Sequence, residues 1–121
     1  MNNYSTFIDI LLNKYYSIIC IASLTECQFN KLLEFNDYTI NYNLALNPNL
    51  TKEQFNKLLE LNTYGINYYL AKNPNLTKEQ INKLLKEDNE QIIINLVHNK
   101  NMDISIKEVI IDQYIKNSIF K

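Results

Sequence analysis

The chain contains an internal repeat of 26 residues, and this repeat limits the architectures that it can adopt. Residues 24–49, 50–75 and 76–101 align without gaps. The first two copies agree at 19 of 26 positions, and the second and third agree at 13. A fixed period of 20–50 residues is typical of stacked arrays, in which each unit buries its apolar side on its neighbours. We therefore expect a single repeat domain over residues 1–121.

Each copy begins with the sequence pattern of a helix start. In the second copy, Thr51 is followed three residues later by Gln54, and the apolar residues Leu50 and Phe55 flank this pair. In such a capping box the threonine hydroxyl accepts from the third helical N–H, and the glutamine side chain bonds back to the cap N–H. The other copies carry Leu24, Thr25, Gln28 and Phe29, and Leu76, Thr77, Gln80 and Ile81. The pattern predicts one amphipathic α-helix at the start of each unit.

A second, shorter helix is expected in the rest of each unit. The first helix should end near a turn-favouring residue, which is Asn36, Asn62 or Asp88. Beyond this turn, apolar residues such as Ile66 and Leu70 stand four residues apart, as in two turns of α- or 3₁₀-helix. Nothing alternates with a period of two, so strands are not expected. The recurring residues Asn47, Asn73 and Asn99 should bond turn backbone groups through their side chains.

The junction between two units resembles a known family. The run Ala71-Lys72-Asn73-Pro74-Asn75-Leu76-Thr77, followed by Glu79 and an apolar pair, is similar to the variant leucine-rich repeat. The resemblance covers residues 24–101. It implies a right-handed superhelix in which each unit pairs an α-helix with a short 3₁₀-type helix. It implies no substrate, because members of the family share architecture rather than activity.

The two ends are expected to form degenerate capping units. In residues 1–23, Phe7, Ile10 and Leu11 reproduce the apolar spacing of the first helices. Residues 102–121 should form a C-terminal cap helix, with Ile106, Val109, Ile110 and Tyr114 on one side. Terminal units of a stack are atypical because one side of each lacks a neighbouring unit. The expected fold is therefore an all-α, right-handed helical-repeat solenoid.

The composition argues against several chemistries. The 12 basic residues are all lysine, and the formal net charge is −1, so no strong field favours nucleic acid or an anionic membrane. The single glycine, Gly65, excludes a glycine-rich phosphate loop and is expected to ease the turn into a second helix. No apolar window is long enough to span a membrane, and two cysteines favour a reducing cytoplasm. We expect no cofactor, metal site or catalytic site.

Tyrosines form the candidate binding surface. Tyr38 and Tyr64 occupy one repeat position, Tyr42 and Tyr68 occupy another, and Tyr69 adjoins Tyr68. If the second helices line one face, these residues would form an aromatic ladder, and tyrosine is favoured at protein interfaces. The alternative is that some of these rings, Tyr42 and Tyr68 above all, pack between units with their hydroxyls in water.

The only histidine, His98, aligns with Leu46 and Lys72, so it should be exposed. It has no motif partner for metal binding or nucleophilic catalysis. We include it in the candidate partner surface rather than in a catalytic site.

These features favour a non-catalytic protein–protein interaction module. One version is a small stoichiometric inhibitor encoded by a phage or another mobile element. The alternative is a nucleic-acid-binding repeat protein that uses tyrosine stacking and a row of Lys31, Lys57 and Lys83. Pairs such as Glu53 with Lys57, and a sequence pI of about 5.8, count against this alternative. Apolar ends of the stack would also favour a homodimer.

Overall fold

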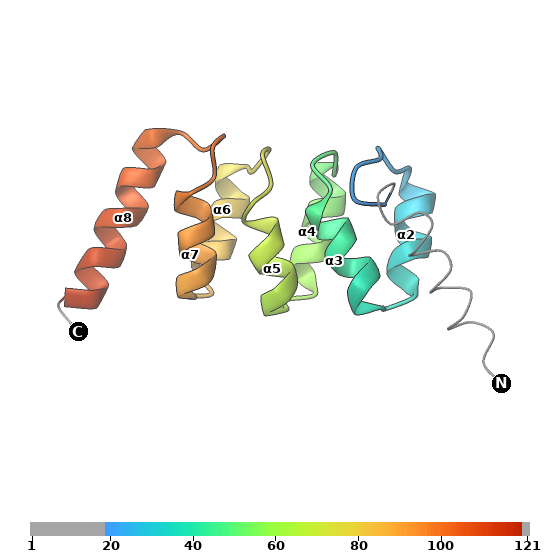
Figure 1. Ribbon diagram of the computed structural model, residues 1–121, viewed down its shortest axis with the longest axis horizontal. Coiled ribbons are helices and arrows are strands. Elements are labelled where there is room, and N and C mark those ends of the chain that lie inside the picture. The colour runs from blue at the N-terminus through green and yellow to red at the C-terminus, as the bar shows by residue number, and fades with distance from the viewer. Residues whose placement is uncertain (1–18, 120–121) are drawn as a thin grey trace.

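The computed structural model describes residues 19–119, which form seven helices and no strands (Figure 1). The all-α expectation is therefore confirmed for this part of the chain. Residues 1–18 lie outside the described residues, and with them Phe7, Ile10 and Leu11 of the expected N-terminal cap.

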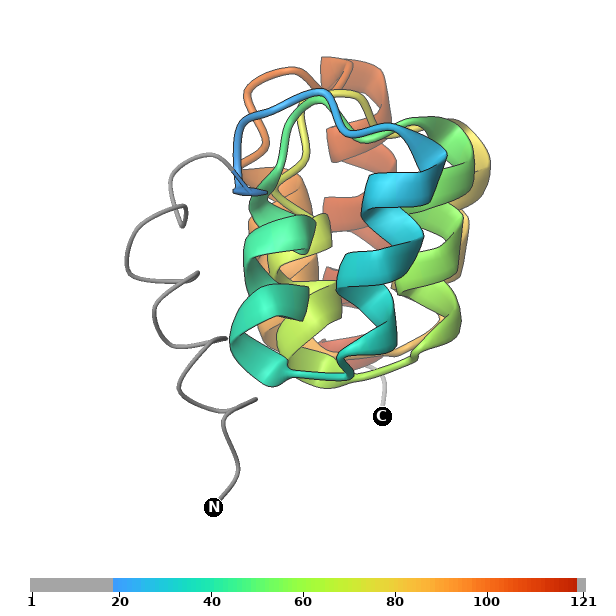
Figure 2. The same cartoon turned by 90° about the vertical axis from the view of Figure 1, so that its right-hand side faces the viewer.

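The helices alternate between two layers, which are separated most clearly in Figure 2. The first layer contains α2 (Glu26–Glu34), α4 (Lys52–Glu60) and α6 (Lys78–Leu85). The second layer contains α3 (Tyr38–Leu46), α5 (Tyr64–Leu70) and α7 (Glu90–Val97). The longer α8 (Ile104–Ile119) follows at one end of the row (Figure 1). Successive helix pairs touch through the second layer, where α3 packs on α5 and α5 packs on α7.

The first-layer helices begin and end as the sequence predicts. Thr51 Oγ1 accepts from Gln54 N at 3.1 Å, and Gln54 Oε1 accepts from Thr51 N at 3.0 Å. The same reciprocal capping box starts α2 and α6. Past the C-terminus of each helix, one residue adopts the left-handed conformation that asparagine and aspartate tolerate, with φ of 49°, 50° and 49° at Asn36, Asn62 and Asp88.

The second-layer elements are α-helices of seven to nine residues rather than the 3₁₀-type helices that the resemblance implies. Their starts differ from one another. Asp37 caps α3 by accepting from Ile40 N, and Asn89 caps α7 by accepting from Gln91 N and Ile92 N. Thr63, at the corresponding position of α5, makes no such bond. These short helices depend on packing more than on their own caps.

The core is one apolar cluster between the two layers. First-layer residues such as Leu58 and Leu84 are fully buried, and so are their second-layer neighbours Leu70 and Leu96. Full burial of a leucine side chain contributes about 1.5–3 kcal/mol. Neither layer could keep its apolar side out of water without the other.

Buried asparagines bond the backbone of their own turns, as expected, and they also join the turns of successive units. We call Asn47, Asn73 and Asn99 the asparagine ladder. Asn99 Nδ2 donates to Asn73 O at 2.8 Å and to Ala71 O at 3.1 Å, while its Oδ1 accepts from Asn101 N at 3.1 Å. Each ladder side chain thus closes its own turn and bonds a carbonyl of the preceding unit. The side chains are buried, so each unmade bond would be costly.

One expected ion pair is wrong. Lys57 does not pair with Glu53 in its own helix, but with Glu26 Oε2 of α2 at 3.2 Å, and it also donates to Asn30 Oδ1 at 3.0 Å. The reason is that α4 faces α2 along this side, which brings carbonyl and carboxylate oxygens within reach of the lysine. The equivalent pair in α6, Lys83 with Glu79, forms within the helix at 3.8 Å.

Candidate partner-binding surface

Each second-layer helix exposes one stripe of residues spaced by four, which places them on the same side of the helix. The stripe of α3 consists of Tyr38, Tyr42 and Leu46. The stripe of α5 consists of Tyr64 and Tyr68, and Lys72 continues it just past the end of the helix. The stripe of α7 consists of Glu90 and Ile94, and His98 continues it just past the end of the helix. Since α3, α5 and α7 lie side by side in Figures 1 and 2, the three stripes adjoin and form one face.

Two of the three helices that form this face differ from the first layer in charge. Helices α3 and α5 contain no charged residue, whereas α2, α4 and α6 each carry lysine and glutamate. An uncharged helix surface that is partly exposed costs little to desolvate, which favours contact with another apolar surface.

Five tyrosine rings form a continuous chain across α3 and α5. We call Tyr38, Tyr42, Tyr64, Tyr68 and Tyr69 the tyrosine surface. The ring centroids lie 6.2 Å apart for Tyr38 and Tyr42, and 5.6 Å apart for Tyr42 and Tyr69. Tyr69 meets Tyr68 edge-on at 5.2 Å, and Tyr68 lies 6.1 Å from Tyr64. These are the separations at which aromatic pairs attract, so each ring fixes the position of the next.

The rings differ in exposure. Tyr38 is 71% exposed and Tyr64 is 52% exposed. Tyr42, Tyr68 and Tyr69 are half-buried, and of these Tyr42 and Tyr69 pack against the core. Tyr42 and Tyr69 therefore join neighbouring units while presenting part of each ring, and the most accessible rings are Tyr38 and Tyr64.

Gly65 has a different role from the expected one. It lies inside α5 without a positive φ, so no unusual turn requires it. A Cβ at this position would lie 2.6 Å from Tyr42 Oη, so a larger residue would require the Tyr42 ring to shift. The glycine therefore makes room for the Tyr42 ring to cross from α3 onto α5.

A basic pocket of about 280 Å³ lies beside the tyrosine surface. It is lined by Lys72, Asn95, His98, Asn99, Lys100 and Asn101, with no carboxylate. Lys72 Nζ lies 4.8 Å from the Tyr68 ring centroid, which links the pocket to the tyrosines. Within residues 19–119, neither Lys72 nor Lys100 forms an ion pair. An anionic group would meet two uncompensated ammonium groups here.

The structure thus brings the five predicted tyrosines into ring contact with one another and places His98 beside them, in the basic pocket. His98 is exposed at the end of α7, where its Nδ1 lies 2.9 Å from Ile94 O and its ring lines the basic pocket. The sequence interpretation overlooked Lys72 and Lys100. A signal for Lys72 was present, because it stands four residues after Tyr68 and aligns with His98.

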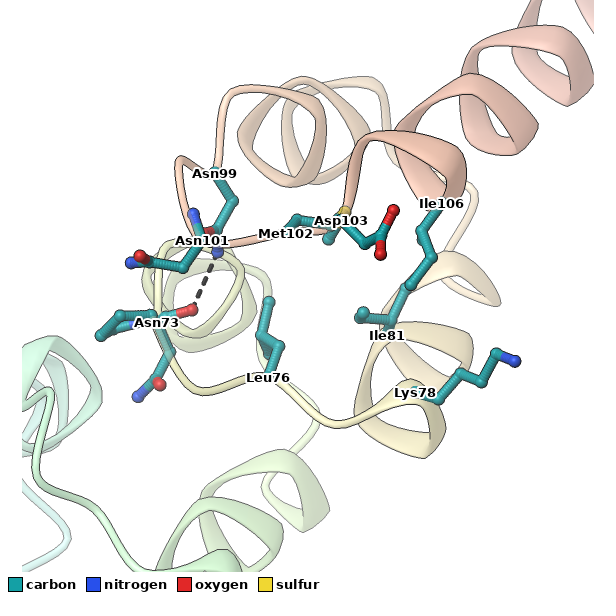
Figure 3. A pocket seen from close by; sticks show the side chains of 10 residues that line it. Asn73, Leu76, Lys78, Ile81, Asn99, Asn101, Met102, Asp103 and Ile106 are labelled. Carbon is teal, nitrogen blue, oxygen red and sulfur yellow. Dashed lines mark hydrogen bonds between the residues drawn. The ribbon is translucent and has the colours of Figure 1, made fainter.

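A second pocket, of about 220 Å³, lies where α8 begins (Figure 3). Its lining mixes Leu76, Ile81 and Ile106 with ladder asparagines and one carboxylate, Asp103. Ser105 donates from both its backbone N and its Oγ to Asp103 Oδ1, and these bonds lower the pKa of that carboxyl. Asp103 is the one carboxylate in this lining, and the bonds from Ser105 already occupy its Oδ1.

Residues 19–119 also lack two other kinds of feature. They hold no group of three histidine, cysteine, aspartate or glutamate residues that could bind a metal ion. None of their helices is both long enough and apolar enough to cross a membrane.

Comparisons of the chain with protein-family models, with curated proteins and with solved structures find no match.

Proposed function

We propose that the chain is a non-catalytic protein-interaction module, built as a right-handed solenoid of 26-residue helical units like those of the variant leucine-rich repeat. Support for the solenoid comes from features that recur every 26 residues. These are the capping boxes, the left-handed residues after the first-layer helices and the asparagine ladder. Stacked units of this kind offer a rigid, extended surface to a partner.

The tyrosine surface is the observation that carries the binding function. Tyr38 is 71% exposed and Tyr64 is 52% exposed, and both lie on helices that contain no charged residue. Their large rings and polar hydroxyls suit contact with another protein. Tyrosines held by ring contacts lose little rotamer entropy on binding. Such preordered aromatic rings are frequent among the residues that dominate binding energy.

The basic pocket indicates the chemistry of the partner. A protein segment that lays apolar side chains on Tyr38 and Tyr64 would bring its next residues to Lys72, Lys100 and His98. An aspartate or glutamate at that point would pair with two lysines that have no ion pair within residues 19–119. The proposed partner is therefore a protein with an apolar segment followed by an acidic residue. A small inhibitor that blocks another protein by stoichiometric binding would work in this way.

Affinity capture from the native cell lysate tests the proposal. The double variant Tyr38→Ala/Tyr64→Ala should lose the captured protein. The control Lys52→Ala/Lys86→Ala, on exposed first-layer positions, should retain it. Lys72→Ala should weaken capture, and the weakening should be smaller at high salt. Equal capture by all three variants would contradict a role for the tyrosine surface.

A nucleic-acid partner is tested in parallel, because Lys72 over the Tyr68 ring could also support a stacked base. Random single- and double-stranded oligonucleotides at low salt should give no electrophoretic shift. A salt-sensitive shift that Lys72→Ala abolishes would favour the nucleic-acid alternative over the protein partner.

A further inference from the structure

Helix α8 has two apolar sides, one that packs on the core and one that is exposed. Ile110 is 2% exposed and faces the core. On another side of the same helix, Ile104 is 73% exposed, Ile111 is 38% exposed and Ile115 is 46% exposed. The spacing of 104, 111 and 115 places these three side chains along one line, with Glu108 among them. We call Ile104, Glu108, Ile111 and Ile115 the α8 outer stripe.

The repeat identifies what this stripe corresponds to in the other units. Counting back by 26, Ile104, Glu108 and Ile111 correspond to Lys78, Asn82 and Leu85 of α6. All three of those α6 residues line the cavity of about 320 Å³ that separates α6 from α8. The outer stripe is therefore the side on which a first-layer helix receives the helix that follows it.

The contact between α2 and α4 shows how such a side is covered. Glu26 and Asn30 of α2, which correspond to Ile104 and Glu108, are both bound by Lys57 of α4. A helix resting on α8 in the same way would place a basic side chain against Glu108.

The outer stripe is also more apolar than its counterparts. Position 104 is isoleucine, whereas the corresponding residues are Glu26, Lys52 and Lys78. A unit with one side open to water is expected to be more polar than the interior units. The opposite trend on α8 indicates a surface that becomes covered.

Charge selects among the helices that could cover it. Glu108 and Asp112 lie on one edge of the stripe, four residues apart. A second copy of α8 packed antiparallel would bring this acidic edge against the same edge of the copy. Like charges at a helix contact are unfavourable, so antiparallel self-pairing is disfavoured.

We infer that the α8 outer stripe is a docking site for a basic amphipathic helix of a protein partner, one with an apolar side and a lysine or arginine that reaches Glu108. This site is separate from the tyrosine surface, which lies on α3 and α5. A helix from another chain would pack on α8 in the way that α4 packs on α2, which is a form of helix-in-groove recognition.

Two synthetic helical peptides test the inference with the full chain. Each is roughly 20 residues long, so that it can form a helix alone. Both carry leucine along one side; the other side carries lysine in one peptide and glutamate in the second. Titration with the lysine peptide, followed by NMR, should shift the amides of α8. The glutamate peptide should bind about tenfold more weakly or not at all.

Variants locate the site. Ile104→Ser/Ile111→Ser should weaken the lysine peptide about tenfold, and Glu108→Lys should reverse the preference toward the glutamate peptide. Tyr38→Ala/Tyr64→Ala should leave the binding unchanged, which separates this site from the proposed function. Equal binding of both peptides, shifts confined to other helices, or no binding by the lysine peptide would overturn the inference. So would a stable dimer of the chain in sedimentation equilibrium, because a second copy would then cover the stripe.

Discussion

The two layers of the molecule are built from the same repeat but differ in their helix caps and in their charge. The first layer is uniform: α2, α4 and α6 share one capping box and carry charges on their outer sides. The second layer varies: α3, α5 and α7 have three different N-cap residues, Asp37, Thr63 and Asn89, and α3 and α5 contain no charged residue. Both layers bury leucine completely on the side where they meet.

The difference indicates where each layer is constrained. Uniform starts in the first layer fix the register of every unit. The second layer makes the contacts between successive units and, on its outer side, carries the tyrosines. If the proposed function is correct, variation at the most exposed of these positions, Tyr38 and Tyr64, would change binding while leaving the buried core unchanged.

The largest loss of stability is expected for substitutions in the core, and these show whether both layers contribute equally to it. Leu58→Ala in α4 and Leu70→Ala in α5 should each lower the free energy of unfolding by about 2–5 kcal/mol, because each side chain is fully buried. Urea denaturation with fluorescence or circular dichroism measures both. A loss below about 1 kcal/mol for either variant would show that its layer packs loosely.

The asparagine ladder comes next. Asn99→Ala removes two donated bonds and one accepted bond inside the protein. It should cost about 2–3 kcal/mol, because buried backbone groups lose their partners. Asn101→Ala is the matched control, since this exposed residue contributes only its backbone N–H to the turn. Equal melting temperatures of the two variants would argue against the ladder.

A smaller effect compares the helix starts of the two layers. Thr51→Ala should cost about 1 kcal/mol, because it removes the cap of α4. Thr63→Asp should instead gain about 0.5–1 kcal/mol, because Asp37 already caps α3 at this repeat position, whereas Thr63 makes no cap bond. Thermal unfolding measures both changes. A destabilised Thr63→Asp variant would show that the buried Thr63 hydroxyl matters in another way.

The smallest effect concerns Asp103. The bonds from the Ser105 side chain and backbone lower the pKa of this carboxyl. A lowered pKa in the folded state favours folding above the ordinary carboxyl pKa, and this contribution disappears as the pH falls through the lowered pKa. NMR titration should find a higher Asp103 pKa in Ser105→Ala than in the wild type. An unchanged pKa would mean that the hydroxyl bond does not form in solution.

Local features of the fold could be predicted from the sequence, because they depend on neighbouring residues. The capping box of Thr51 and Gln54 and the turn at Asn62 each lie within a few positions of the chain. The asparagine ladder was predictable because the same residue recurs at the same turn.

Features that depend on the distance between units could not be predicted. Lys57 pairs with Glu26 across 31 residues, and a Cβ at Gly65 would crowd the ring of Tyr42 on another helix. The repeat placed Tyr38 with Tyr64 and Tyr42 with Tyr68 at matching positions. It could not give the distances between their rings, or the contact of Tyr69 with Tyr42. The basic pocket was missed because Lys72 and Lys100 meet only through the turns of two successive units.

The claim that the tyrosine surface exists for recognition is tested most directly by the unfolding free energy of Tyr38→Ser/Tyr64→Ser in urea. These two rings are the most exposed of the surface, so the variant should unfold within about 0.5 kcal/mol of the wild type. A loss of more than about 2 kcal/mol would show that the two rings stabilise the fold. A structural role would then explain the tyrosines without a binding partner.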